Sequence, residues 1–256
     1  MTAPVLRELP EINGRGAAVA FEHVSKSFGA KQVLRDVSFE VGPGEALCIL
    51  GRSGTGKSVT LKLIISLLKP DQGKIWIEHD EITHLKESEL SRVRRKMGFL
   101  FQDAALFDSL TLYENLALPL KRLTRKSPGE VDLVVDKVLR QVGLAADKKK
   151  MPSELSGGMR KRAGLARALV LEPKILLADE PSSGLDRITS SEIDDLLLMQ
   201  KEEHKTALIV VTHDVRGARR VGDRIIVLDK GALIADGLFT QIEHSENDVA
   251  RHLITE

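Results

Sequence analysis

The stretch ALCILGRSGTGKS, residues 46–58, decides the fold that we predict for this chain. Its first five residues are continuously apolar, as in a strand that is buried on both faces of a parallel sheet. The next eight contain three glycines and end in a lysine and a serine, and residues 58–68 are predicted to form a helix. A strand, a glycine-rich turn and a helix in this order predict a phosphate-binding loop in an α/β protein.

The residue types of this turn explain why it suits phosphate. Gly51, Gly54 and Gly56 let the backbone turn tightly, so that successive N–H groups and the helix N-terminus converge on phosphate oxygens. Lys57 adds a positive charge for the outer phosphates, and the Ser58 hydroxyl can ligate Mg²⁺. The residues predicted to bind ATP here are Gly51, Arg52, Ser53, Gly54, Thr55, Gly56, Lys57 and Ser58.

The composition is that of an ordinary globular protein with a sizeable core. The 256 residues are 42% apolar, and 38 Lys and Arg nearly cancel 37 Asp and Glu, so no overall charge favours nucleic acid. No apolar run approaches the roughly 18 residues of a membrane-spanning helix, and residues 1–18 lack the apolar stretch of a secretion signal. We therefore expect a cytoplasmic chain, in which the single cysteine, Cys48, is a buried core residue.

The segments before the loop differ from those after it. Residues 18–28 and 31–41 alternate apolar and polar residues, which predicts half-buried antiparallel strands. Apolar residues at helical spacing over 131–142 predict a helix, in a helical region near 103–165. We therefore predict an α/β fold with an antiparallel β subdomain and a helical subdomain.

Two later runs continue the parallel sheet. KILLAD (174–179) and ALIVVTH (207–213) are typical of buried strands, and a helix is predicted between them over 187–204. Asp179 and Glu180 follow the first of these strands, at the carboxyl edge where open α/β sheets bind ligands. Asp179 can hold the magnesium shell, and Glu180 can orient and deprotonate an attacking water. An acidic turn with only a structural role is the alternative for this pair taken alone.

With these residues in place, the sequence over about 17–240 closely resembles the nucleotide-binding domains of ABC transporters. LSGGMRKR (155–162) resembles the signature segment of that family, whose Ser156, Gly157 and Gly158 would close the γ-phosphate site of an opposite subunit. A serine and two glycines at a helix start offer a hydroxyl and backbone donors with no side chain in the way. Met159 departs from the usual glutamine, which puts one polar contact to the nucleotide in doubt.

The same resemblance gives roles to four further features. Gln102 matches the loop that senses magnesium and water, and His213 matches the switch histidine that contacts the γ-phosphate and supports the Glu180 water. Residues 182–186, SSGLD, match the loop that links two sites across a dimer. Phe28 stands where the family has an aromatic residue on the adenine, although a core phenylalanine is an equal alternative. The resemblance therefore implies catalytic Glu180 and His213, and metal-binding Ser58, Gln102 and Asp179.

The resemblance also implies partners. It predicts a homodimer and a separate integral-membrane permease, with the chain bound to the cytoplasmic side of the inner membrane. The signature segment and FQDAALFDSLTLYENLALPL (101–120) look most like ATPases of Mla or MCE-type systems, which move phospholipids or other lipids across Gram-negative envelopes. That likeness implies an MlaE-like permease, an MCE-domain protein and a small cytoplasmic accessory protein. Residues 104–120 would suit a groove for a permease helix, or only the packing of the helical subdomain.

Two other functions fit parts of the pattern. One is the ATPase of an amino-acid or other small-solute importer, although only 43 residues follow His213, too few for the regulatory domain of some importers. The other is a soluble ABC ATPase that acts on nucleic acid or the ribosome. Only 97 positions separate Ser58 from Leu155, and there is no cysteine pair for zinc, which argues against this class. We expect a leader at 1–16, an ABC ATPase domain at 17–240 and a tail at 241–256.

Overall fold

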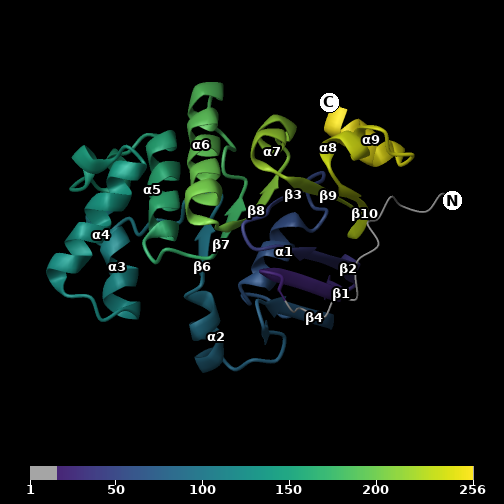
Figure 1. Cartoon of the computed structure of the whole chain (residues 1–256), viewed down its shortest axis with the longest axis horizontal. Coiled ribbons are helices and arrows are strands. Elements are labelled where there is room, and N and C mark those ends of the chain that lie inside the picture. Colours follow the sequence, from purple (N-terminus) through teal and green to yellow (C-terminus); the bar gives the residue numbers. More distant parts are fainter. Residues whose placement is uncertain (1–15, 256) are drawn as a thin grey trace.

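The computed structural model describes residues 16–255, so the leader predicted at 1–16 lies outside it except for Gly16. Two sheets form the framework (Figure 1). One is antiparallel, in the order β2-β1-β4-β5, and includes the two half-buried strands predicted before the loop. Its strands are β1 (Val19–Phe28), β2 (Lys31–Val41), β4 (Gln72–Ile77) and β5 (Asp80–Glu81).

The second sheet carries the predicted strands that are buried on both faces. Its order is β10-β9-β3-β8-β7-β6, and neighbouring strands are parallel except for the antiparallel pair β9 and β10. The strands are β3 (Ala46–Leu50), β6 (Met97–Leu100), β7 (Ile175–Asp179), β8 (Ala207–Thr212), β9 (Arg224–Asp229) and β10 (Ala232–Gly237).

Helices lie along and beside this sheet (Figure 1), and short 3-10 turns join some of them. They are α1 (Lys57–Ile64), α2 (Glu87–Arg94), α3 (Leu112–Leu123), α4 (Pro128–Gln141), α5 (Gly157–Leu169), α6 (Arg187–His204), α7 (Val215–Val221), α8 (Phe239–Glu243), α9 (Asp248–Thr255), η1 (Ala145–Asp147) and η2 (Pro152–Glu154). In the part of the chain that the structure describes, none of these helices combines the length and apolarity needed to cross a bilayer.

Strand β3 shows why the predicted apolar run is continuous. Cys48 and Leu50 face a core that also contains α3 to α9, whereas Leu47 and Ile49 face a core formed with α1 and the antiparallel sheet. All five residues of the strand are buried, as both faces of a covered parallel strand require. Cys48 is fully buried, as predicted, and this burial raises its thiol pKa to about 12.

The helical subdomain lies at one end of the parallel sheet. Helices α3 and α4 stand beside α5, away from α1 and the antiparallel sheet (Figure 1). The stripe predicted on α4 faces the core: Val131, Val135, Val138 and Leu139 are buried. Ser127 begins this helix by accepting a hydrogen bond from the Glu130 N–H, while the Glu130 carboxylate accepts one from the Ser127 N–H.

Two predicted boundaries differ from those in the structure. The helix predicted over 58–68 ends at Ile64, because Ser66 adopts a left-handed conformation (φ 56°) and the Leu67 N–H donates back to the Lys62 carbonyl. The boundary expected at residue 240 falls inside α8, and buried Ile242, Ala250 and Ile254 pack the last residues against the body. The helix predicted over 187–204 is confirmed as α6.

Candidate active site

The glycine-rich turn joins the end of β3 to the start of α1, as predicted. A Cβ atom at Gly51 would lie 2.4 Å from the Leu228 carbonyl oxygen, and one at Gly56 would lie 2.6 Å from Leu34 Cδ2. Gly56 also has φ 107°, a conformation that other residues rarely adopt. Close packing against β2 and β9 therefore requires glycine at both positions and holds the turn in one shape.

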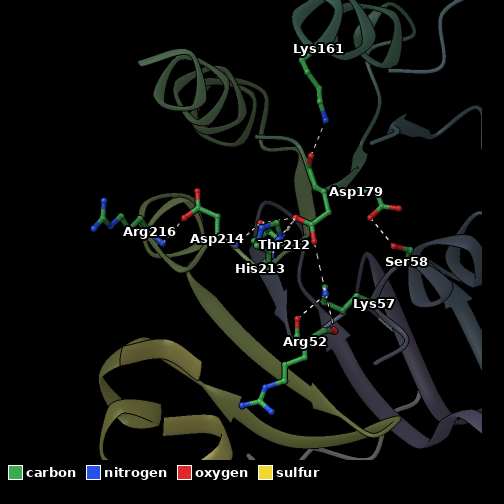
Figure 2. Close-up of polar contacts among 11 residues, drawn as sticks. Arg52, Lys57, Ser58, Lys161, Asp179, Thr212, His213, Asp214 and Arg216 are labelled. Atoms are coloured by element: carbon green, nitrogen blue, oxygen red, sulfur yellow. Dashed lines mark hydrogen bonds and ion pairs between the residues drawn. The ribbon is translucent and has the colours of Figure 1, made fainter. Parts of the chain in front are cut away.

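Lys57 lies at the first position of α1 and is almost fully buried, with 7% of its surface exposed. Its ammonium donates to the carbonyl oxygens of Gly51 and Arg52, at 2.8 and 3.2 Å (Figure 2). Burial lowers the pKa of Lys57, and the nearby carboxylates of Glu180 and Asp179 oppose this effect. The turn thus curls around a cation that its own carbonyl groups hold in place.

Ser58 and Asp179 form the second contact of the site. The Ser58 hydroxyl donates to Asp179 Oδ1 at 2.9 Å, joining the start of α1 to the end of β7 (Figure 2). Burial raises the pKa of Asp179, and the hydrogen bond from Ser58 acts in the opposite direction. A hydroxyl and a carboxylate this close are two oxygen ligands of the kind that Mg²⁺ prefers.

Glu180 is the residue after this strand, and its backbone is unusual. It has φ 48°, a left-handed conformation that costs about 1 kcal/mol in a residue other than glycine. Its N–H donates to the Val211 carbonyl at 2.8 Å, so the end of β8 holds the turn. The carboxylate is directed into the site, with Oε1 3.9 Å from Lys57 Nζ.

The other oxygen of Glu180 contacts the loop after β8. His213 Nδ1 lies 2.8 Å from Glu180 Oε2, which also accepts from the Thr212 hydroxyl at 3.3 Å. Carboxylate oxygens accept hydrogen bonds, so this contact fits the tautomer of His213 that carries its proton on Nδ1. The His213 side chain is 68% exposed, whereas that of Glu180 is 13% exposed. The pair therefore presents a mostly buried carboxylate beside an accessible imidazole.

A cavity of about 740 Å³ opens over these groups, within the size range of ligand sites in proteins. Most of the residues predicted to bind nucleotide line it. The lining includes Phe28, Arg52, Ser53, Gly54, Gly56, Lys57, Ser58, Gln102, Glu180 and His213. Phe28 is 47% exposed and so is not a core residue. Gln102 also lines the cavity, and no described residue hydrogen bonds to its side-chain amide.

The other predicted residues fall into two groups. Gly51, Thr55 and Asp179 lie outside the lining of the cavity, and the Thr55 hydroxyl donates to the Arg52 carbonyl. Ser156, Gly157 and Gly158 are absent from the lining as well, because they begin α5 in the helical subdomain. Ser156 caps that helix by accepting a hydrogen bond from the Met159 N–H at 3.3 Å. The chain therefore brings the signature segment to a separate, exposed place.

Sequence reasoning missed some residues of the site. Lys31 and Val33 line the cavity beside Phe28, and antiparallel pairing of Phe28 with Lys31 could have indicated Lys31. Thr212 contacts Glu180, and its position directly before His213 was a usable signal. Lys161 contacts the Glu180 backbone from α5, and no sequence pattern indicated it.

These residues fit a magnesium-bound nucleotide. In the described chain no cluster of three or more acidic, histidine or cysteine side chains could hold a metal ion alone. Ser58 and Asp179 would instead hold Mg²⁺ together with phosphate oxygens, the arrangement usual in phosphate-binding loops. When bound, Mg²⁺ offsets the negative charge of the phosphates. Lys57 can bind the outer phosphates, and Glu180 can accept a proton from water.

Comparison with known proteins agrees with this chemistry. A family model described as "ABC transporter" matches residues 34–183. "Probable ribonucleotide transport ATP-binding protein mkl" of Mycobacterium leprae is 42% identical over 239 residues, which are 93% of this chain and 69% of that protein. "Protein TRIGALACTOSYLDIACYLGLYCEROL 3, chloroplastic" of Arabidopsis thaliana is 36% identical over 95% of this chain and 75% of its own. "Methionine import ATP-binding protein MetN 1" of Bacillus cereus is 39% identical over 88% of this chain and 67% of that protein.

Solved structures show the same fold. The dimeric ATP-binding cassette MJ0796, in a post-hydrolysis state bound to ADP and Pi, has a TM-score of 0.81 and 36% identity, and covers 86% of this chain and 98% of its own. The cbiO1 protein of Clostridium perfringens, part of the ABC transporter complex cbiONQ, has a TM-score of 0.80 and 26% identity. It covers 94% of this chain and 100% of its own. Both have the α/β fold with antiparallel and helical parts described above.

Proposed function

This chain belongs to the ABC transporter family as an ATP-binding subunit with ATPase activity, and we propose that it powers the transport of phospholipid or another lipid through a separate permease. The observation that carries the ATPase part of the proposal is the contact between the start of α1 and the end of β7. The start of α1, after the glycine-rich turn, supplies Lys57 and Ser58, and the end of β7 supplies Asp179, with Glu180 as the next residue. In this proposal ATP and Mg²⁺ bind between them.

Each side chain has a defined task in the proposed reaction. Lys57 binds the outer phosphates, while Ser58 and Asp179 hold the metal ion. Glu180 takes the proton of the attacking water, and His213, whose Nδ1 proton contacts Glu180, keeps that carboxylate in place. Gln102 reaches the same cavity and completes the contact with the metal ion and water. Phe28, an exposed residue of the cavity lining, stacks on the adenine.

We propose further that the working unit is a dimer of this chain. Ser156, Gly157 and Gly158 lie outside the cavity of their own chain, which supports a role at the cavity of a second copy. Two-fold pairing would then supply the same missing segment to both sites. MJ0796, a relative in structure, is dimeric in a state bound to ADP and Pi.

The lipid part of the proposal depends on two resemblances. Residues 101–120 and the signature segment look like those of Mla or MCE-type ATPases, and one relative bears the name of a galactolipid, trigalactosyldiacylglycerol. An MlaE-like permease, an MCE-domain protein and a small cytoplasmic accessory protein would complete the assembly. The chain would bind it from the cytoplasmic side of the inner membrane.

The loop before α3 offers a contact for the permease. Phe107 is 52% exposed there, and the fully buried Asn115 fixes its backbone by accepting from the Phe107 N–H and donating to the Phe107 carbonyl. A rigid, exposed aromatic side chain is a common anchor in protein interfaces. We therefore assign the permease contact to this loop.

The test is to purify the tagged chain from mildly solubilised membranes of its own cell and identify bound proteins and lipids by mass spectrometry. We expect an integral permease, an MCE-domain protein and phospholipid to co-purify with the chain. We expect the permease to be missing from the material purified with the Phe107→Ala variant. Leu133→Ala is the matched control, because Leu133 is 70% exposed on α4 of the same subdomain. Recovery of a permease without enriched lipid would contradict the lipid proposal.

A second candidate is the import of a small solute. Two of the relatives are named for ribonucleotide transport and methionine import, at 42% and 39% identity. The same purification distinguishes the two candidates, because a solute-binding protein in place of the MCE-domain protein supports import.

A further inference from the structure

Lys161 is a buried cation that the ATPase chemistry above does not use. It lies in the second turn of α5, near the end of the signature segment (155–162), and only 7% of its surface is exposed. Its ammonium donates to the carbonyl oxygen of Glu180 at 2.9 Å. Figure 2 shows the side chain extending from α5 to the chain that follows β7. The contact therefore links the helix of the signature segment to the proposed catalytic base of the same chain.

The backbone that Lys161 contacts is the one that sets the direction of the Glu180 carboxylate. Glu180 has a left-handed conformation (φ 48°), and its N–H is held by the Val211 carbonyl at 2.8 Å. Its carbonyl oxygen accepts two hydrogen bonds, from Lys161 Nζ and from the Ser183 N–H at 3.2 Å. A strained conformation persists only where its surroundings hold it. Lys161 holds the carbonyl side of this residue, while β8 holds the amide side.

The electrostatics show that packing alone does not account for a lysine here. Burial lowers the pKa of Lys161, and the charges of Asp103, Glu180 and Asp179 oppose that effect. An ammonium buried without a close carboxylate partner is unfavourable unless a specific contact compensates for it. Among the described residues the only hydrogen bond of this ammonium is the one to the Glu180 carbonyl. That bond is the specific contact that compensates for the burial of the ammonium.

We propose that Lys161 is a positioning residue for hydrolysis, which anchors the Glu180 peptide so that the carboxylate faces the water beside the phosphates. The inference rests on the proposed role of Glu180 as the base. It has a consequence for the dimer: when an opposite subunit contacts the start of α5, Lys161 passes any shift of that helix to Glu180 of its own chain. Each site would then respond to closure of the other.

The experiment measures steady-state ATP hydrolysis and nucleotide binding by the full chain. In Lys161→Met the side chain keeps its unbranched stem but ends one atom earlier and loses both the charge and the donor. We expect kcat to fall about 10- to 100-fold while KM for ATP changes less than about twofold. Lys161→Arg retains a cationic donor and is expected to restore kcat to within about threefold of the wild type. Lys137→Met is the matched control, because Lys137 lies exposed on α4 and pairs with exposed Glu172.

A double-mutant cycle separates positioning from general loss of structure. If Lys161 acts through Glu180, Lys161→Met added to Glu180→Gln lowers the residual rate no further. The proposal is overturned if the double variant shows the product of the two single-variant losses in kcat. A wild-type kcat in Lys161→Met also overturns it. Full activity of Glu180→Gln would instead overturn the assignment of the base, so the two failures are distinguishable.

A second variant covers the case in which Lys161→Met does not fold. Glutamine is polar but one bond shorter, so Lys161→Gln also loses the contact with the Glu180 carbonyl. It is expected to lower kcat about 10-fold at nearly unchanged KM. A wild-type kcat in this variant overturns the proposal.

Discussion

The phosphate-binding loop and the signature segment are both glycine-rich starts of helices, yet the chain surrounds them differently. Around the loop, Lys57 is held by main-chain carbonyls and Ser58 by Asp179. At the signature segment, Ser156 is exposed and its hydroxyl only caps its own helix. One motif is completed inside the chain, and the other is presented to the outside. The comparison teaches that a local pattern fixes the shape of a helix start, while its surroundings decide what it can bind.

The largest effect is expected at the site of the phosphate-binding loop, which the chain completes by itself. Glu180→Gln keeps the shape of the residue but cannot take a proton, so we expect ATP hydrolysis to fall about 1000-fold while ATP still binds. Phosphate release and nucleotide binding measure the two properties separately. Glu172→Gln is the control, because Glu172 is an exposed glutamate that pairs with Lys137. Undiminished hydrolysis in Glu180→Gln would remove this residue from the role of base.

The next prediction concerns the signature segment, which is exposed on the surface of the chain. Ser156→Arg places a large cation where a second copy would approach, so hydrolysis is expected to fall about 100-fold through loss of the closed arrangement. ATP binding to the single chain is expected to remain, because Ser156 lies outside the cavity. Ser91→Arg, an exposed position on α2, is the matched control. Normal hydrolysis by Ser156→Arg would contradict a site composed from two chains.

A third carboxylate sharpens the comparison, because it lacks the partners that Asp179 and Glu180 have. Asp194 on α6 is 7% exposed, and no residue within 16–255 hydrogen bonds to its side chain. Burial, with the nearby charge of Asp214, raises its pKa to about 6 from 3.8. The folded chain therefore holds this proton more tightly than the unfolded chain, and ionisation destabilises the fold as pH rises from about 4 through 6.

We therefore expect Asp194→Asn to stabilise the protein at pH 7.5 by up to about 3 kcal/mol. At pH 5 the gain is expected to be about half as large, because the wild-type group is then mostly protonated in the folded chain. Urea unfolding at the two pH values measures both quantities. Glu192→Gln, an exposed change on the same helix, is the control. A gain that does not depend on pH would show that the charge of Asp194 is not its source.

The smallest expected effect tests the proposed contact of Phe28 with adenine. Phe28 is 47% exposed, so its stacking on adenine contributes modestly, and Phe28→Ala is expected to weaken ATP binding about 2- to 10-fold. Titration with ATP and with a triphosphate lacking the base should show the loss only for ATP. Phe107→Ala, another exposed phenylalanine, is expected to leave ATP affinity unchanged. An equal loss for both ligands would argue against stacking.

Much of the fold was accessible from the sequence because its signals are local. The buried strands and the helix over 187–204 follow from runs and periods of apolar residues, and the structure confirms them. The end of α1 was predicted too late. The left-handed position after this helix is a serine, Ser66, and not the glycine that usually indicates a helix end. Antiparallel pairing brings Lys31 opposite Phe28, a contact that the alternation of residues alone did not specify.

The sequence by itself determined the chemistry of this protein: a glycine-rich loop with Lys57 and Ser58, an acidic pair after a buried strand, and His213 after another. Spacing within one segment fixes these features, because each depends on neighbours a few residues away. Only the tertiary structure decided that β7 and β8 lie side by side, which brings His213 to Glu180, and that α5 delivers Lys161 to the same peptide. Contacts between separate elements depend on strand order and helix packing, which the whole chain sets together.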